Sequence, residues 1–202
     1  DIPKLRLGAS STLTRYVLLS HLENYIAHFP HVRITISCQS TYQTLHLLDE
    51  EKIDLGLIGR PQKLRGYYFH PLLKIRDTFV CTRQYLENQK KLYPDEPLIQ
   101  AATFMMLDED NITRQTVNAQ LKEHHVELSH ILEVTTMDLL IQFAEIGLGI
   151  ACVIRDFVKK ELEEGTLVEV PVGFSFPPRE IGFVCRQKDA NLDLIVPFFG
   201  EE

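Results

Sequence analysis

Three clusters of hydroxyl side chains stand where a predicted strand ends and a predicted helix begins. They are Ser10-Ser11-Thr12, Ser40-Thr41 and Thr135-Thr136. A helix start carries backbone N–H groups without intrahelical partners and the positive end of the helix dipole, and hydroxyl groups add further donors. Such a junction can bind a carboxylate, a sulfate or a phosphate. The alternative is plain N-capping, for which Ser and Thr are preferred residues.

Arg60 could supply the positive charge that such an anion needs. It follows the third predicted strand, between Gly59 and Pro61, and falls at the same rim as the first two clusters. A guanidinium can hold a carboxylate through two parallel hydrogen bonds. The alternative for Arg60 is a solvated arginine at a turn.

Two other arginines, Arg114 and Arg155, stand near predicted helix starts in the second half of the chain. Each could face a bound ligand, or it could pair locally with Asp110 or Asp156. The sequence leaves both roles open.

The remaining reactive residue types do not form a pattern typical of catalysis or metal binding. The eight histidines show no ligand spacing, and the adjacent pair His124-His125 points to different faces of a helix. A nucleophile needs a neighbouring base, and Ser10 has no histidine that the sequence places beside it. We therefore expect no catalytic residue, no metal ligand, no cofactor and no enzyme activity.

These residues must be positioned by an alternation of strands and helices in the first third of the chain. Strands are expected at residues 4–9, 32–36 and 54–58, and helices at residues 13–29 and from Ser40 to about Ile53. Strand, helix, strand, helix and strand in this order favour a parallel sheet with crossover helices. Two strands at 67–73 and 78–82 follow without a helix between them, which indicates that the chain leaves the first unit there.

The second unit repeats the alternation. After a loop marked by Pro94 and Pro97, strands are expected at residues 104–107, 131–134, 149–153 and 167–170, and helices at residues 112–125, 135–147 and 155–163. A strand at 180–186 and a final helix at 192–199 are expected to return to the first unit. The chain is thus predicted to be an α/β protein of two subdomains.

Composition narrows the class of function. The 202 residues carry a net charge of -7 and a pI near 5.6, without a Lys/Arg cluster, so the chain alone is a poor ligand for nucleic acid. Three of the four cysteines lie in apolar runs, which is typical of reduced thiols in the cytoplasm. The start of the chain does not resemble a signal peptide, and the most apolar stretch, 139–154, is too short and too polar for a membrane span.

The chain resembles the effector-binding domain of LysR-type transcriptional regulators over essentially all of its length. The resemblance rests on the order and spacing of five stretches: Leu5 to Ser10 with Arg15-Tyr16; Phe29-Pro30 to Ile34; Leu47-Leu48 with Ile53 to Ile58; His70-Pro71-Leu72; and Gly147-Leu148-Gly149-Ile150-Ala151.

The resemblance implies two Rossmann-like subdomains joined by two crossover strands, as in type 2 periplasmic binding proteins. Residues 1–75 and 178–202 would form subdomain I, and residues 76–177 would form subdomain II. It also implies an effector in the cleft between them. The family's contact positions correspond to Ser10, Ser11, Thr12, Ser40, Thr41, Arg60, Thr135 and Thr136.

We therefore expect a cytoplasmic sensor that binds a small anionic metabolite, with a di- or tricarboxylate such as citrate as the first guess. The family's N-terminal winged helix-turn-helix and linker helix are absent from this sequence, so DNA would be bound only through those missing parts. A homodimer of this domain, and a homotetramer of the full-length protein, are implied as well. The alternative is an extracytoplasmic solute-binding protein of a transporter.

Overall fold

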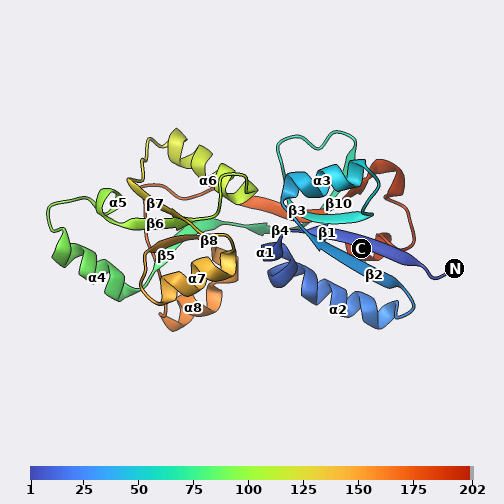
Figure 1. Ribbon diagram of the computed structural model, residues 1–202, viewed down its shortest axis with the longest axis horizontal. Coiled ribbons are helices and arrows are strands. Elements are labelled where there is room, and N and C mark those ends of the chain that lie inside the picture. The colour runs from blue at the N-terminus through green and yellow to red at the C-terminus, as the bar shows by residue number, and fades with distance from the viewer. Residues whose placement is uncertain (201–202) are drawn as a thin grey trace. The chain divides into compact units, whose positions relative to one another are not determined.

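A computed structural model describes residues 1–200 of the chain (Figure 1). The chain divides into two compact units, which are described separately below. Unit 1 comprises residues 1–74 together with the chain from Arg179 onward, and unit 2 comprises Ile75–Pro178. Each unit has its own five-stranded sheet. The range expected for subdomain I runs to residue 202, and residues 201 and 202 lie outside the described part.

The sheet of unit 1 has the strand order β2-β1-β3-β10-β4. Its strands are β1 (Lys4–Ala9), β2 (Arg33–Cys38), β3 (Leu55–Gly59), β4 (Tyr67–Ile75) and β10 (Arg179–Arg186). The first three are parallel, with Ala9 opposite both Cys38 and Leu57, and β10 runs antiparallel to β3. All three parallel strands therefore end at one edge of the sheet.

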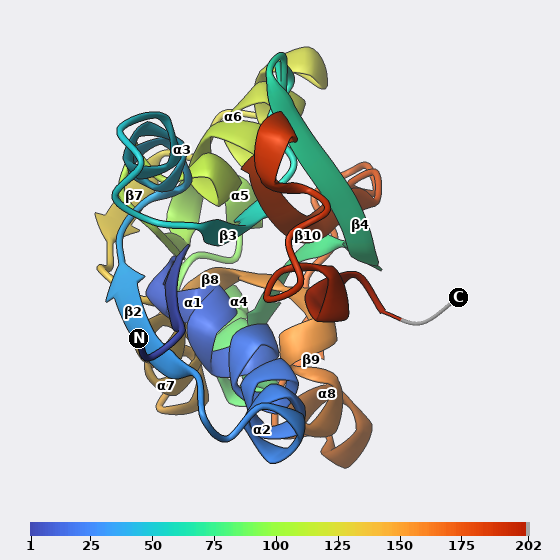
Figure 2. The same cartoon turned by 90° about the vertical axis from the view of Figure 1, so that its right-hand side faces the viewer.

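The helices of unit 1 cover both faces of this sheet. One helical segment consists of α1 (Ser11–Leu13), a π-helical turn (Thr14–Leu18) and α2 (Leu19–His28), and the other is α3 (Thr41–Asp49). Figures 1 and 2 show α2 and α3 on opposite sides of the strands. The winding therefore reverses between β1 and β3, and the carboxyl ends of these two strands form a topological switch point, where open α/β sheets bind ligands.

The amino end of β3 is tied to β1 by an arginine–carboxylate contact. Asp54 accepts hydrogen bonds from the Arg6 backbone N–H at 2.8 Å and from Arg6 Nη2 at 2.9 Å. Partial burial acts to raise the pKa of Asp54, but the Arg6 hydrogen bonds and the charges of Arg6 and Arg186 outweigh it, so this pKa lies below its ordinary value. This contact fixes the edge of the sheet opposite the hydroxyl clusters.

Unit 2 has the strand order β7-β6-β8-β5-β9. Its strands are β5 (Asp77–Cys81), β6 (Thr103–Met106), β7 (His130–Glu133), β8 (Ile150–Ile154) and β9 (Val168–Glu169). Its α-helices are α4 (Arg83–Leu92), α5 (Leu98–Ala101), α6 (Ile112–Glu123), α7 (Met137–Glu145) and α8 (Lys159–Glu164). The core of the unit includes Phe79, Phe104 and Val117, all nearly inaccessible to solvent.

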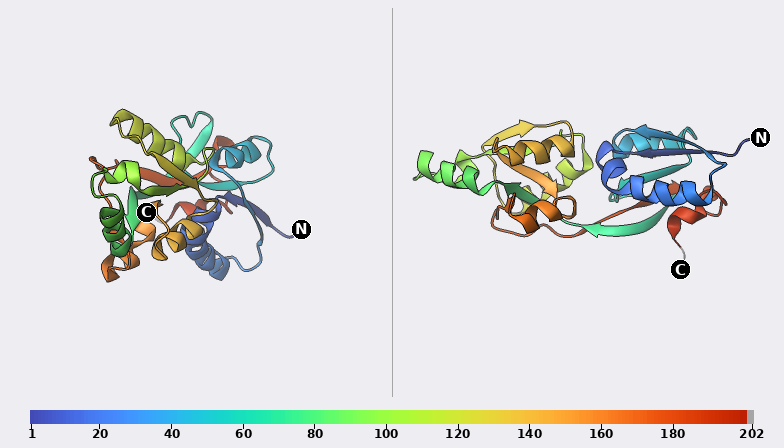
Figure 3. Two further views of the ribbon diagram at one scale, coloured as in Figure 1. Left: turned by 60° about the vertical axis from the view of Figure 1, so that its left-hand side comes forward. Right: turned by 90° about the horizontal axis from the view of Figure 1, so that it is seen from below.

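Two helices of unit 2 were not expected from the sequence. Between β5 and β6 only a loop at Pro94 and Pro97 was expected, yet α4 and α5 form there. Helix α4 lies at the periphery of unit 2 (Figure 3) and buries only Tyr85, and most of its residues are polar or charged. The capping bond from the Tyr85 N–H to Thr82 Oγ1, at 3.1 Å, marks its start.

The expected final helix at residues 192–199 is wrong. In this range the structure has only a short 3₁₀ turn, Val196–Phe199, and another, Gln187–Asp189, precedes it. Ile195 and Phe198 are buried three residues apart, which gives the segment a helix-like pattern. Pro197 has no N–H to donate, and its ring clashes with the preceding helical turn, so an α-helix cannot continue through it.

The cysteines follow the expected burial. Cys81, Cys152 and Cys185 are buried and Cys38 is exposed. Burial raises the pKa of Cys81 to about 12, and burial together with the nearby Asp189 carboxylate raises the pKa of Cys185 to about 11. These thiols are therefore inert at neutral pH.

Among residues 1–200, no helix is long and apolar enough to cross a membrane.

Candidate functional site

The three hydroxyl clusters all cap helices. Ser10 Oγ accepts a hydrogen bond from the Leu13 N–H at 3.1 Å, and Ser40 Oγ accepts one from the Gln43 N–H at 3.2 Å. Thr136 Oγ1 accepts the N–H of the third residue of its helix in the same way, at 3.3 Å. The capping interpretation is therefore correct at each cluster. It does not exclude ligand binding, because a capping hydroxyl still has its own O–H to donate.

The sheet of unit 1 brings two clusters and Arg60 to one edge. Ser10 follows β1, Ser40 follows β2 after one intervening residue, and Arg60 follows β3 directly. Adjacent strands lie about 4.8 Å apart and a residue advances about 3.3 Å, so the register places the Cα atoms of Ser10 and Arg60 about 8 Å apart. An arginine side chain and a small acid can bridge that separation.

The other residues of these clusters differ in exposure. Ser11 is exposed and Thr12 is half-buried in the first helical turn, whereas Thr41 is buried at 4% relative exposure. Thr41 can therefore offer a backbone N–H more readily than its hydroxyl. Thr135 and Thr136 belong to unit 2, where Thr135 is exposed after β7 and Thr136 is half-buried at the start of α7.

A small hydrogen-bond network that the sequence did not indicate holds the second cluster. Gln39 Nε2 donates to Thr44 Oγ1 at 2.8 Å, and Thr44 Oγ1 donates to the Ser40 carbonyl at 2.9 Å. A Cβ atom at position 8 would lie 2.7 Å from Gln39 Nε2, so Gly8 is the residue that leaves room for this amide. The loop between β2 and α3 is thereby fixed before any ligand arrives.

Arg60 is neither a free cation nor a solvated turn residue. Its backbone N–H donates to the Glu180 carbonyl at 2.9 Å, which extends the β3–β10 ladder by one residue. Its Nη1 lies 2.7 Å from Glu180 Oε1, and its guanidinium lies over the Phe69 ring at 5.4 Å. The Arg60 side chain remains 50% exposed. Glu180 and Phe69 were both missed by the sequence analysis, because β10 is distant from β3 in the chain and β4 pairs with β10 and not with β3.

Arg114 has a structural role within unit 2. It is only 5% exposed, and its Nη1 donates to the Leu107 carbonyl at 2.8 Å while its Nε donates to Asn118 Oδ1 at 3.2 Å. Its carboxylate partners are Glu133 on β7, at 3.4 Å, and Glu109 in the preceding loop, at 3.9 Å, and not Asp110. The arginine therefore joins the loop after β6, helix α6 and strand β7.

Arg155 also has a different partner from the one expected. Its Nε lies 2.9 Å from Glu169 Oε1 on β9, whereas Asp156 accepts a hydrogen bond from the Arg76 N–H at 3.2 Å. The local pair with Asp156 is thus wrong. The arginine pairs instead with a carboxylate 14 residues away, on a strand that lies on the other side of β5.

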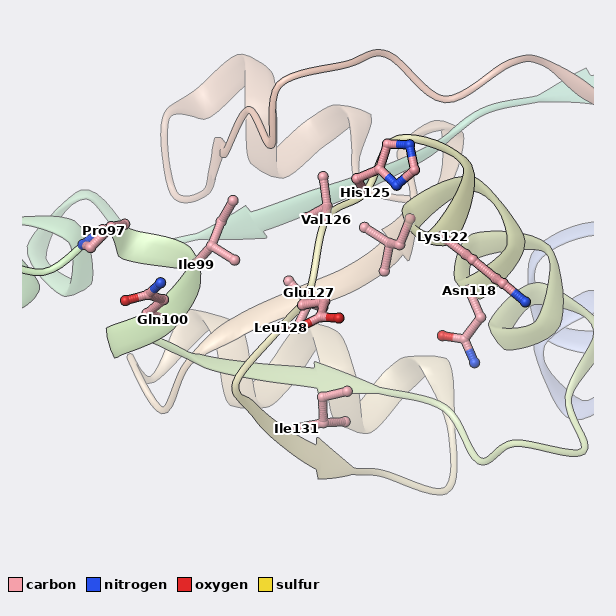
Figure 4. A pocket seen from close by; sticks show the side chains of 11 residues that line it. Pro97, Ile99, Gln100, Asn118, Lys122, His125, Val126, Glu127, Leu128 and Ile131 are labelled. Carbon is pink, nitrogen blue, oxygen red and sulfur yellow. The ribbon is translucent and has the colours of Figure 1, made fainter.

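Unit 2 contains a groove whose lining includes no residue of the hydroxyl clusters. Figure 4 shows Ile99 and Gln100 of α5, Lys122 of α6 and Ile131 of β7 around it. It also includes Glu127 and sits at the carboxyl end of α6, where the helix dipole is negative. Both features disfavour a small anion there. Among residues 1–200, no group of three or more His, Cys, Asp or Glu side chains is placed to hold a metal ion.

Known proteins resemble this chain in sequence and in fold. It is 24% identical to YeiE of Escherichia coli K12, named as an uncharacterized HTH-type transcriptional regulator, over 85% of this chain and 58% of YeiE. It is 25% identical to the HTH-type transcriptional regulator CbbR of Rhodospirillum rubrum, over 83% of this chain and 55% of CbbR. The chain therefore spans little more than half the length of these relatives.

Solved structures share the fold at low sequence identity. The regulatory domain of HypT from Salmonella typhimurium superposes with a TM-score of 0.79 at 15% identity, and covers 98% of this chain and 92% of its own. The reduced regulatory domain of OxyR2 from Vibrio vulnificus superposes with a TM-score of 0.76 at 18% identity, and the match covers 98% of this chain and 94% of the OxyR2 chain. The expected fold class, two Rossmann-like α/β subdomains of the LysR regulatory type, is confirmed.

A family profile described as the LysR substrate binding domain matches residues 2–199, which is nearly the whole chain. The resemblance drawn from the sequence is thereby confirmed, and the chain belongs to the family of LysR substrate-binding domains.

Proposed function

We propose that this chain is the effector-sensing part of a LysR-type transcription regulator and that it binds a small carboxylate at the carboxyl edge of the unit 1 sheet. The observation that carries the proposal is the convergence of two capped helix starts and Arg60 at the topological switch point of β1 and β3. Backbone N–H groups of both helix starts, the hydroxyls of Ser10 and Ser40, and the Arg60 guanidinium supply the donors.

The donor set favours an anion over a neutral sugar. A charge-assisted hydrogen bond contributes about 1.5–3 kcal/mol, roughly twice a neutral one, and Arg60 can form such bonds through the guanidinium nitrogens that Glu180 does not contact. A di- or tricarboxylate such as citrate remains the first candidate. The cluster Thr135-Thr136 offers unit 2 the same combination of helix start and hydroxyls, and we propose that it also contacts the effector.

In the whole protein, effector binding would control DNA binding through the N-terminal domain that the family carries. A ligand can do this only if it binds one conformation of the sensor better than another. The alternative of a transporter's solute-binding protein is not favoured, because the relatives in sequence are named as transcriptional regulators.

We also propose that the domain forms a homodimer through its amphipathic helices. Leu19 and Ile26 on α2 are 56% and 51% exposed, and Ile146 just after α7 is 76% exposed. Leu19 and Ile26 stand seven residues apart on one face of α2, and an exposed apolar helix face is typical of interaction surfaces. Sedimentation at high micromolar concentration should give a dimer, and a strictly monomeric mass would contradict this proposal.

The ligand class is tested by a thermal-shift screen with organic acids, amino acids, sugar phosphates and neutral sugars. A ligand at a hundredfold excess over its Kd stabilises the folded state by about 2.7 kcal/mol. We expect carboxylates to raise the Tm, and the variant Arg60→Ala to abolish most of that shift. Arg33→Ala, an exposed arginine at the amino end of β2, is the matched control and should keep it. A screen in which only neutral sugars or aromatic compounds raise the Tm would contradict the proposal.

A further inference from the structure

The environment of Arg60 is built by three neighbouring strands. Arg60 extends β3, Glu180 lies opposite it on β10, and Phe69 comes from β4 on the far side of β10. Glu180 Oε1 contacts one guanidinium nitrogen, Nη1, at 2.7 Å. No described residue is hydrogen-bonded to the other two nitrogens, so most of the five N–H donors of Arg60 remain available.

Gly182 allows the Phe69 ring to lie where it does. A Cβ atom at position 182 would stand 2.7 Å from Phe69 Cζ and 2.2 Å from the His70 carbonyl oxygen. The absence of a side chain on β10 therefore lets the ring approach the sheet beside Glu180. The guanidinium is held over the ring face by a cation–π contact and at its edge by the carboxylate.

We propose that Glu180 is a specificity-determining residue of the carboxylate site, an internal carboxylate that limits the negative charge of the ligands Arg60 accepts. This inference rests on the proposed function. Glu180 neutralises Arg60 and stays beside it when a ligand binds the remaining guanidinium nitrogens. Its repulsion of the ligand then grows with every additional negative charge. Specificity is often built from such a repulsive element, placed next to the attractive one.

The consequence is a preference for less highly charged acids than Arg60 alone would select. Glu180 is 28% exposed, so solvent weakens the repulsion without removing it. The charge of Glu180 therefore changes the affinity of a highly charged acid more than that of a singly charged one, which shifts the ranking among carboxylates.

The variant Glu180→Gln tests whether the charge of Glu180 limits the charge of the bound acid. Gln keeps an oxygen that accepts from Arg60 Nη1, while the negative charge is lost. Calorimetric titration is done with two probes, citrate and acetate. We expect citrate affinity to rise about tenfold and acetate affinity about threefold or less. Glu169→Gln is the matched control, since Glu169 pairs with Arg155 at 2.9 Å in unit 2 with a similar exposure. It should leave both affinities unchanged.

A second measurement needs no effector. Phenylglyoxal modifies exposed guanidinium groups, and peptide mass spectrometry reports the rate at each arginine. We expect Arg60 to react several-fold faster in Glu180→Gln than in the wild type, with Arg33 as an internal reference whose rate does not change.

The two measurements separate the possible failures. If the acids bind but the ratio of their affinities and the Arg60 modification rate are the same in both proteins, the role of Glu180 is overturned and the proposed function stands. If Arg60 reacts faster in the variant, yet no carboxylate binds either protein or protects Arg60, the proposed function fails and the selectivity role fails with it.

Discussion

Arg60 in unit 1 and Arg114 in unit 2 look alike in the sequence, and the structure gives them opposite environments. Arg60 directly follows strand β3, and Arg114 lies in the first turn of α6, the helix that follows strand β6. Arg60 is 50% exposed, and its side chain makes one ion pair and one ring contact. Arg114 is 5% exposed, and it donates to a backbone carbonyl, an amide and a carboxylate. An arginine whose N–H groups already donate to other groups of the protein cannot also donate to a ligand.

The two arginines are expected to contribute differently to the free energy of unfolding. Removing one partner from a buried set of charged hydrogen bonds leaves polar groups unsatisfied, which costs several kcal/mol. An exposed ion pair contributes only about 0–1 kcal/mol. We therefore expect Arg114 to be needed for stability and Arg60 to be needed for binding.

The largest expected effect is on the stability of Arg114→Ala. This change leaves the Leu107 carbonyl without the Arg114 donor and removes the contact between α6 and β7. We therefore expect a loss of about 2–3 kcal/mol in the free energy of unfolding. The estimate is below that for a fully buried pair because Glu133 is 55% exposed. Urea denaturation followed by circular dichroism measures it. A loss under about 0.5 kcal/mol would mean that Arg114 is no structural link.

The next effect is on ligand binding by Arg60→Ala. Loss of a charge-assisted bond of about 1.5–3 kcal/mol should weaken binding of the effector acid about tenfold to a hundredfold. Arg60→Lys should recover only part of that loss, because an ammonium cannot form two parallel bonds with a carboxylate. Calorimetric titration of the wild type and both variants measures these affinities. Urea denaturation should show that the free energy of unfolding of Arg60→Ala is almost unchanged.

A smaller effect concerns the opposite edge of the unit 1 sheet. The folded-state pKa of Asp54 is lowered, so its contribution to stability is present above the unfolded-state pKa of about 3.9 and is lost as the pH falls through the folded-state value. Asp54→Asn should therefore destabilise the protein at pH 7 and make it less sensitive to acid below about pH 4. Urea midpoints of both proteins at pH 7 and pH 3.5 test this. Equal midpoints at pH 7 would show that the contact with Arg6 contributes nothing.

The smallest effect on stability is expected from modifying the exposed thiol. Cys38 should react with a disulfide reagent at neutral pH within the folded protein. The three buried cysteines, whose thiols lie among apolar side chains, should react only after unfolding. A thiol count of one in buffer and four in denaturant is the expected result, with the Tm unchanged by labelling. Rapid reaction of Cys81 would show that the core of unit 2 opens readily.

Much of the fold could be predicted from the sequence because its signals are local. Ser40 and Thr136 cap helices, which is the alternative that the sequence offered, and each cap is a bond over three residues. The prediction of a final helix at residues 192–199 was wrong because it gave the helix-like spacing of Ile195 and Phe198 more weight than the helix-breaking Pro197. Helix α4 was missed because it buries a single residue.

The candidate site was predictable only in part. The position of Arg60 at the sheet edge follows from one strand ending beside another. Its partner Glu180 does not, because that pair depends on the register of β10 against β3, across 120 residues of chain. The same holds for Arg114, whose partner Glu133 was not its nearest acidic neighbour in sequence. Which charges are already paired is information that only the tertiary structure supplies.

The central claim is that the unit 1 sheet edge binds the effector, and amide chemical shifts in a titration with citrate, or with whichever acid the screen ranks first, test it most directly. We predict that the largest shifts in unit 1 fall at Ser10–Thr12, at Ser40–Thr41 and at Arg60, and that Arg60→Ala reduces them. Saturable binding whose shifts are confined to the groove around Lys122 and Ile131 of unit 2, with the unit 1 edge unaffected, would contradict the account.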